Sequence, residues 1–141
     1  MDVNYKIQSH KSFEDTIEDL KDSLKEHGFG VLWTFDLKGK LLEKGLDYDQ
    51  KYTILEVCNP KQALEVLNIN HEAGFFLPCK IIVYENHGNI YVGMPKPTFL
   101  IKLLDDSNLE NAASMVESSL KTAILKSCEV FTDKDLSHQN V

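Results

Sequence analysis

The sequence lacks the long apolar runs and the clustered basic residues that several large classes of protein require. Its apolar stretches stop well short of the roughly 20 residues that a membrane-spanning helix needs. The formal net charge of −7 argues against a surface that follows a nucleic-acid backbone, because such a surface needs clustered lysine and arginine. We therefore expect neither a membrane nor a nucleic acid among its partners.

A secretory leader and a disulfide framework are also missing. The first residues, MDVN, are acidic and polar where a signal peptide would be basic and then apolar. Three cysteines, an odd number, do not make the framework of a small secreted protein. These absences favour a cytoplasmic location.

Familiar catalytic motifs are absent as well. We find no paired acids, no phosphate-cradling glycine loop and no Ser-His-Asp arrangement. The glycines at residues 28–30 stand where a helix meets a strand, the reverse of the dinucleotide-binding context. The sequence assigns no cofactor and no reaction type, and we lean towards a protein that is not an enzyme.

What the chain does have is the composition of one globular domain. Its hydrophobic content of 43% and charged content of 26% are ordinary, and 141 residues suffice for a real core. We expect a single domain over residues 1–128, followed by a polar tail, residues 129–141, that frays.

The apolar periodicity predicts an alternation of strands and helices. Strands are expected at residues 3–8, 29–37, 52–58, 81–84 and 90–92, and helices at residues 12–27, 37–44, 60–68, 99–104 and 107–128. The tight turn at residues 86–89 joins antiparallel strands. The expected fold is therefore α+β, a two-layer sandwich of helices on a mixed, largely antiparallel four- or five-stranded sheet.

Three details of this fold follow from the patterns. The strand at 29–37 is apolar enough to be central in the sheet. The first and last helices are both one-sided, so we expect them on the same face of the sheet. In the helix at 60–68, Leu64 is expected to point inward together with Ala63 and Leu67.

Two cysteines mark the ends of predicted strands. Cys58 closes one strand and precedes a helix that Asn59 can cap, while Cys79 follows Pro78 and opens the next strand. A thiol beside a helix N-terminus lies in a positive partial field that favours the thiolate, so we expect Cys58 to be the more acidic. The alternative is that both are small buried hydrophobes, the commoner role of an unpaired cysteine.

Whether these thiols meet depends on residues 70–78. If this segment spans the sheet, the strand at 79–85 runs antiparallel to the strand at 52–58 and the thiols are neighbours. If it folds locally, the unit is a parallel crossover and the thiols lie at opposite ends. The segment has no clear helical or strand period, so we predict spanning, with Cys58 and Cys79 within reach of each other.

Other residues near the cysteines are weaker candidates. His71 would make a Cys-His thiol site or a third metal ligand, but the close spacings of zinc sites are absent and a solvated loop histidine is favoured. The helix start at Asn59, with Lys61 nearby, could hold a small anion through free backbone amides. The candidate ligand-binding set is Cys58, Asn59, Lys61, His71 and Cys79, with Cys58 and Cys79 also the candidate catalytic residues.

Several blocks, in this order, resemble one known family, the domain of unknown function family 302. They are SFE at 12–14, EHGFGVL at 26–32, YTILEVCNP at 52–60, EAGFFLPC at 72–79 and the hairpin at 81–85. The resemblance covers about residues 3–125 and implies a small α+β domain that usually forms a homodimer, with no implied activity. Residues 93–97 depart from the family pattern of a polar residue, an acid and a proline, so no role for that acid is carried over.

Two functions remain open. The first is a small soluble dimeric domain that binds a small ligand or a partner, and the apolar run at residues 75–77 supports self-association. The second is a thiol-dependent redox, sulfur-carrying or metal-binding protein that uses Cys58 and Cys79. The first is slightly favoured because it requires no particular distance between the thiols.

Overall fold

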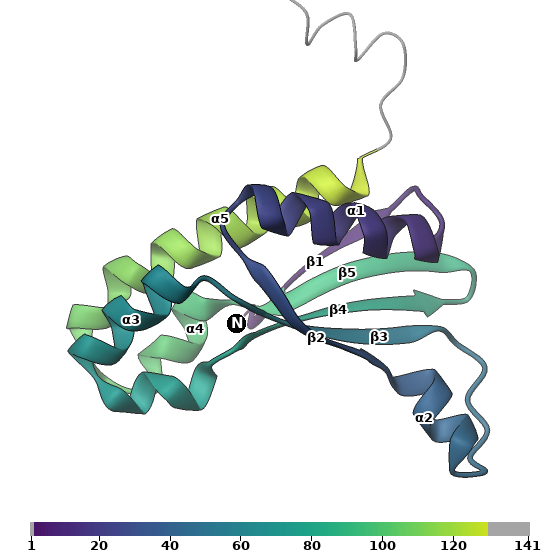
Figure 1. Cartoon of the computed structure of the whole chain (residues 1–141), viewed down its shortest axis with the longest axis horizontal. Coiled ribbons are helices and arrows are strands. Elements are labelled where there is room, and N and C mark those ends of the chain that lie inside the picture. Colours follow the sequence, from purple (N-terminus) through teal and green to yellow (C-terminus); the bar gives the residue numbers. More distant parts are fainter. Residues whose placement is uncertain (1, 130–141) are drawn as a thin grey trace, which may run out of the picture.

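The computed structural model describes residues 2–129 and contains one five-stranded antiparallel sheet with helices on one face and at one end (Figure 1). The strands are β1 (Asn4–Ser9), β2 (Gly30–Asp36), β3 (Tyr52–Cys58), β4 (Cys79–Asn86) and β5 (Asn89–Pro95). The helices are α1 (Phe13–Glu26), α2 (Leu37–Glu43), α3 (Pro60–Ile69), α4 (Pro97–Lys102) and α5 (Glu110–Cys128), with short 3-10 helices η1 (His71–Phe76) and η2 (Ser107–Leu109). The predicted α+β class and antiparallel sheet are confirmed, whereas the expected tail lies outside the described residues except for Glu129.

Helix α1 begins and ends where local side-chain chemistry places it. The Ser12 hydroxyl accepts a hydrogen bond of 3.0 Å from the Asp15 amide, which satisfies one free N–H of the first turn. Gly28 ends the helix with a φ of 86°. A Cβ atom there would also lie 3.1 Å from the Asn59 side chain, so glycine suits this position for two reasons.

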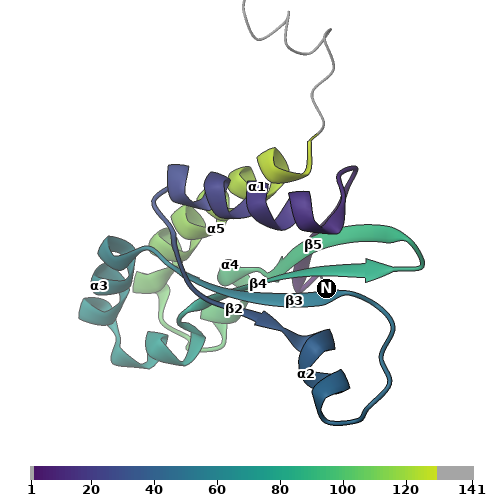
Figure 2. The ribbon, with the colours of Figure 1, turned by 45° about the vertical axis from the view of Figure 1, so that its right-hand side comes forward.

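Helices α1 and α5 cover the same face of the sheet, as predicted, and form the main core with it (Figure 2). Leu20 and Leu24 of α1 and Leu120 of α5 are fully buried. They pack on the buried row of the central strands, which consists of Leu55, Val57, Ile81, Val83 and Val92. Alternate residues of these strands point to the opposite face, which no helix of the described chain covers.

The prediction of a central strand at residues 29–37 was wrong. The sheet order is β1-β5-β4-β3-β2, so β2 is an edge strand that pairs only with β3. Leu32 and Trp33 are 62% and 51% exposed, and the register shifts between Val31 and Trp33. The apolar composition of a strand does not show whether its side chains are buried in the middle of a sheet or exposed at its edge.

A second cluster lies beyond the end of the sheet rather than over it. Here α3, η1 and α4 pack against the first half of α5 (Figure 1). The cluster consists of Val66, Ala73, Ile101, Leu109, Ala112 and Ala113. The inward face of α3 differs from the prediction, because Val66 is buried while Leu64 is 62% exposed.

A carboxylate from α5 caps α4. The α4 N-cap residue, Lys96, makes no side-chain bond. Instead, Glu117 Oε1 accepts hydrogen bonds from the Thr98 amide at 3.1 Å and the Thr98 hydroxyl at 2.7 Å, and Oε2 lies 3.2 Å from Lys121 Nζ. Burial raises the pKa of Glu117, but the bonds from Thr98 and Lys121 outweigh burial and leave the pKa lowered.

The two clusters should unfold together, because α5 contributes residues to both. We expect one cooperative thermal transition for the full chain, and Leu120→Ala should lower the free energy of unfolding by about 2–5 kcal/mol. Leu125→Ala is the matched control, since Leu125 lies on the same helix and is 48% exposed. Calorimetry that resolves two independent transitions would contradict this prediction.

Replacing Glu117 should destabilise the protein in a pH-dependent way. Because its pKa is lowered in the fold, its contribution is present above the ordinary glutamate range and is lost as the pH falls through the folded pKa. At pH 7 we expect Glu117→Ala to cost about 1–3 kcal/mol, while Glu110→Ala, on the exposed side, costs little. Urea unfolding near pH 3 should show a smaller difference between Glu117→Ala and wild type, and an unchanged difference would refute the argument.

Candidate functional site

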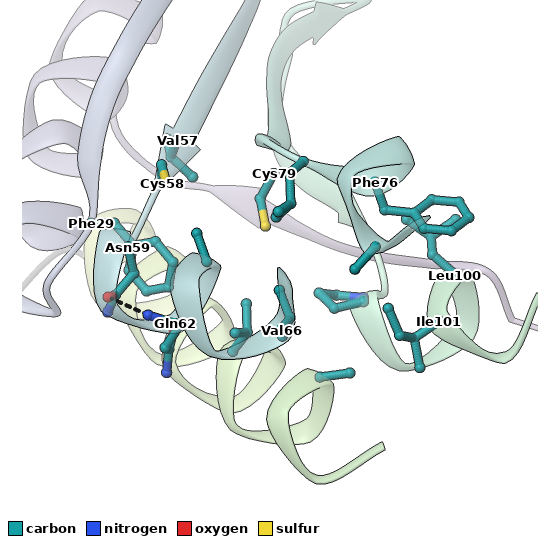
Figure 3. A pocket seen from close by; sticks show the side chains of 16 residues that line it. Phe29, Val57, Cys58, Asn59, Gln62, Val66, Phe76, Cys79, Leu100 and Ile101 are labelled. Atoms are coloured by element: carbon teal, nitrogen blue, oxygen red, sulfur yellow. Dashed lines mark hydrogen bonds between the residues drawn. The ribbon is translucent and has the colours of Figure 1, made fainter. Parts of the chain in front are cut away.

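An apolar pocket lies between the end of the sheet and the second cluster (Figure 3). Its walls come from β3, β4, α3, η1, α4 and α5, and its cavity volume is about 60 Å³. The lining is apolar except for two thiols, Cys58 and Cys79, and two amides, Asn59 and Gln62. Several lining residues are only half-buried, so the pocket has a mouth at the surface.

The junction of β3 and α3 builds one wall of this pocket. Cys58 is the last residue of β3. The Asn59 side chain then accepts a hydrogen bond of 3.2 Å from the backbone N–H of Gln62 (dashed in Figure 3). Pro60 follows at the first helical position, where its fixed φ suits a helix and its missing N–H costs nothing. This cap directs the first turn of α3, with Gln62 and Ala63, along the pocket.

Helix η1 builds the opposite wall. The Asn70 side chain accepts a hydrogen bond of 2.9 Å from the Glu72 amide and so starts a helical turn directly after α3. That turn places Phe76 and Leu77 in the lining and leaves Phe75 81% exposed. The expectation that residues 70–78 span the sheet was therefore wrong, since the segment folds locally.

The antiparallel arrangement of β3 and β4 nevertheless holds. Val57 pairs with Cys79, so both cysteines lie at the same end of the sheet. The chain returns there without a spanning segment because α3 turns away from the sheet instead of running back along it (Figure 1). Both alternatives weighed from the sequence made the separation of the thiols depend on residues 70–78, whereas the direction of α3 decides it.

The two thiols share the pocket but form no bond. Directly paired residues point to the same face of a sheet, and successive residues point to opposite faces. The Cys79 side chain therefore points to the same face as its partner Val57, while the Cys58 side chain points to the opposite face. The described cysteines are all free, and Cys128 lies in the main core. Figure 3 shows Cys79 directed into the cavity, with Cys58 beside Val57. Burial, and secondarily Cys58, raises the pKa of Cys79 to about 11.

Two of the predicted site residues lie elsewhere. Lys61 and His71 are exposed and do not line the pocket. Over residues 2–129, no group of three or more histidine, cysteine, aspartate or glutamate side chains is placed to hold a metal ion. Cys58, His71 and Cys79, which were weighed from the sequence as a ligand set and disfavoured, form no such group in that part of the chain.

Sequence reasoning missed Gln62, whose Oε1 atom is buried without a hydrogen-bond partner. The available signal was its place three residues after the Asn59 cap, where a side chain lies over the first turn of the helix. Sequence reasoning also missed Phe76 and Leu77 as lining residues, having assigned them to an exposed run. A buried acceptor without a partner costs free energy, so Gln62 stands out among the pocket residues.

Comparison with known proteins now identifies the fold. The profile of the family described as domain of unknown function DUF302 matches residues 5–127. The chain belongs to the DUF302 family. A crystal structure of an uncharacterised conserved DUF302 protein from Bacillus stearothermophilus is 43% identical, with a TM-score of 0.88 over 92% of this chain and 100% of that one. No curated protein matches this DUF302 chain.

No helix between residues 2 and 129 of this DUF302 chain combines the length and the hydropathy that crossing a bilayer requires.

The raised pKa of Cys79 should be visible in its chemistry. We expect iodoacetamide to alkylate Cys79 of the native protein slowly at pH 8, with a rate that rises towards a midpoint near a pKa of about 11. In urea-unfolded protein the midpoint should return to about 8.5, the ordinary value for cysteine. Peptide mapping by mass spectrometry follows each site separately, and a native midpoint below 9 would contradict the burial argument.

Proposed function

We propose that this DUF302 domain binds a slim, neutral apolar molecule with a hydrogen-bond donor at one end. The observation that carries the proposal is an apolar pocket whose only buried polar atom without a partner, among the described residues, is Gln62 Oε1. A ligand hydroxyl or amide N–H would satisfy this acceptor and remove the cost of leaving it unpaired. The apolar lining would take the rest of the molecule.

The size of the pocket favours a chain over a ring. Its volume of about 60 Å³ is well below the ~150 Å³ of a dry cavity that accepts benzene. An unbranched alkyl chain needs less width than a ring and can extend through the mouth of the pocket. We therefore favour a short linear alcohol or a similar alkyl compound as the ligand class.

The surroundings of Gln62 support a neutral ligand over the small anion suggested by the sequence. The Asn59 side chain already accepts the hydrogen bond of the Gln62 backbone N–H, and Pro60 has no backbone N–H. Lys61 is exposed and outside the lining. The start of α3 therefore presents little positive charge to the cavity.

Thiol chemistry is the second candidate function, supported by the presence of Cys58 and Cys79 in one pocket. Against it, the raised pKa of Cys79 keeps that sulfur protonated near neutral pH, and a protonated thiol is a poor nucleophile. A double Cys58→Ala, Cys79→Ala variant separates the two functions. Retained ligand binding in that variant favours the apolar site, and loss of binding favours the thiols.

Binding of 1-hexanol should therefore be saturable and confined to the pocket. We expect amide chemical shifts to move at the start of α3, in η1 and in α4 when 1-hexanol is titrated into labelled protein. Ala63→Phe should fill the pocket and abolish these shifts, whereas Leu64→Phe, on the exposed side of the same helix, should leave them unchanged.

The role of Gln62 has its own test within this titration. Gln62→Leu should weaken 1-hexanol binding by about tenfold, since one hydrogen bond contributes about 1–1.5 kcal/mol. Hexanoate should bind more weakly than 1-hexanol to wild type. Shifts that never saturate, or that persist in Ala63→Phe, would reject the pocket as the binding site.

A further inference from the structure

The face of the sheet that lies away from α1 and α5 carries an ordered set of aromatic side chains (Figure 1). Residues paired across strands point to the same face, so the register of β3, β4 and β5 places Tyr52, Tyr84 and Tyr91 in one row. Their rings stack in turn, with centroids 5.5 Å apart at each step. Trp33 and Phe35 of β2 stack on each other on the same face. Stacked rings hold one another in place, so this face has a defined shape.

A concave region of about 570 Å³ lies beside the tyrosine row. On this face it is lined by the side chains of Lys6, Tyr52, Ile54, Lys80, Ile82 and Tyr84, and we call it the hollow. Its volume falls in the range of roughly 300–1,000 Å³ that is usual for small-molecule sites. The apolar pocket at the end of the sheet has a volume of about 60 Å³. A ligand too large for the pocket can therefore be held in the hollow.

The register shows how the hollow is built. On β4 the residues that point to this face are, in order, Lys80, Ile82 and Tyr84, so Ile82 lies between a cation and an aromatic ring. Ile54 is the partner of Ile82 on β3 and extends the aliphatic floor. Gly93, the partner of Ile82 on β5, adds no side chain to the middle of the hollow.

The tyrosine wall presents the edges of its rings to this floor. The planes of Tyr52 and Tyr84 differ by 22°, so each ring turns one face to the other and leaves its edge for a neighbour placed along the strands. The edge of an aromatic ring is partially positive and its face partially negative, so an edge attracts the face of another ring. A flat aromatic molecule over Ile54 and Ile82 can therefore place its face against both edges.

The charged side chains of the hollow favour an anion. Lys6 and Lys80 are exposed and make no ion pair within residues 2–129. Asp2, the one acid among the lining residues, is already paired with Lys96 at 3.5 Å. Glu56 is the cross-strand partner of Lys80 but lies outside the lining and forms no ion pair in the described part of the chain. The hollow thus has two cations available on a chain whose net charge is −7.

We propose that the hollow binds a flat aromatic carboxylate. The aromatic body lies over Ile54 and Ile82 against the tyrosine edges, and the carboxylate lies above Gly93 between Lys6 and Lys80. The spacing of strands and residues puts the Cα atoms of these lysines ~12 Å apart, a distance that two extended lysine side chains can bridge through one carboxylate. The hollow and the pocket have no lining residue in common, so this site stands independently of the proposed function.

The charge and the aromatic character of the ligand can be tested separately on the wild-type protein. We expect 2-naphthoate to bind saturably in an NMR titration and to shift amide signals in β1, β3, β4 and β5 around the hollow. Its neutral counterpart, 2-naphthamide, should bind about tenfold more weakly because it lacks the charge. The saturated analogue, decahydro-2-naphthoate, should also bind more weakly because it has no aromatic face. Ala63→Phe, which fills the pocket, should leave 2-naphthoate binding unchanged.

Substitutions in the hollow should change the binding of the anion alone. Lys6→Met and Lys80→Met remove a charge and keep an aliphatic stem, so each should raise the dissociation constant of 2-naphthoate about threefold and leave that of 2-naphthamide unchanged. Glu56→Gln removes the neighbouring acid and should strengthen 2-naphthoate binding about twofold. Lys25→Met and Lys102→Met are the matched controls, since both lysines are exposed outside the hollow. Far-UV circular dichroism establishes that every variant is folded.

Three results would overturn the proposal. The first is that the shifts caused by 2-naphthoate never saturate or lie away from the hollow. The second is that 2-naphthamide binds as tightly as 2-naphthoate, or that the two lysine variants bind it like wild type, because the cations then play no part. The third is that a second copy occupies the hollow, in which case wild-type protein sediments as a dimer and the amide signals around the hollow do not respond to 2-naphthoate.

Discussion

Helix α5 is the element on which the rest of this structure depends. Its second half packs on the sheet through Leu120 and Ile124, and its first half closes the cluster beyond the end of the sheet. Glu117 lies between these halves and caps α4, which forms one wall of the pocket. The shape of the pocket is therefore set by a helix anchored in the main core. A rigid support of this kind allows a small cavity to exist without collapsing onto its own side chains.

The features that were predictable from the sequence are those with a local chemical cause. Ser12 caps α1, Gly28 ends it, and His87-Gly88 forms the turn with positive φ that pairs β4 with β5. The predictions that were wrong concern the neighbours of a segment in the folded structure. The composition of β2 does not reveal that it is an edge strand, and the pattern of α3 does not reveal that the helix leaves the sheet. Both depend on contacts between distant parts of the chain.

The candidate site was partly predictable for the same reason. Cys58, Asn59 and Cys79 lie in the pocket because each stands where a strand meets a turn or a helix, and those junctions are legible in the sequence. The relative direction of the two thiols could not be predicted from the sequence. It follows from the register, which pairs Cys79 with Val57 and so gives the thiols opposite directions. A change of one residue in that register would have paired the thiols directly.

Strand β3 forms part of the pocket at one end and contacts α2 towards the other. Cys58 ends β3 at the pocket, whereas Tyr52 begins it at the far end, where its ring stacks on that of Tyr84. Between them, Thr53, Leu55 and Val57 are buried under the helices, while the alternate residues face the open side. The pocket is thus assembled at one end of the strand, where β3 meets α3. Because neighbouring strands hold β3 on both sides, the sheet fixes the wall that β3 contributes to the pocket.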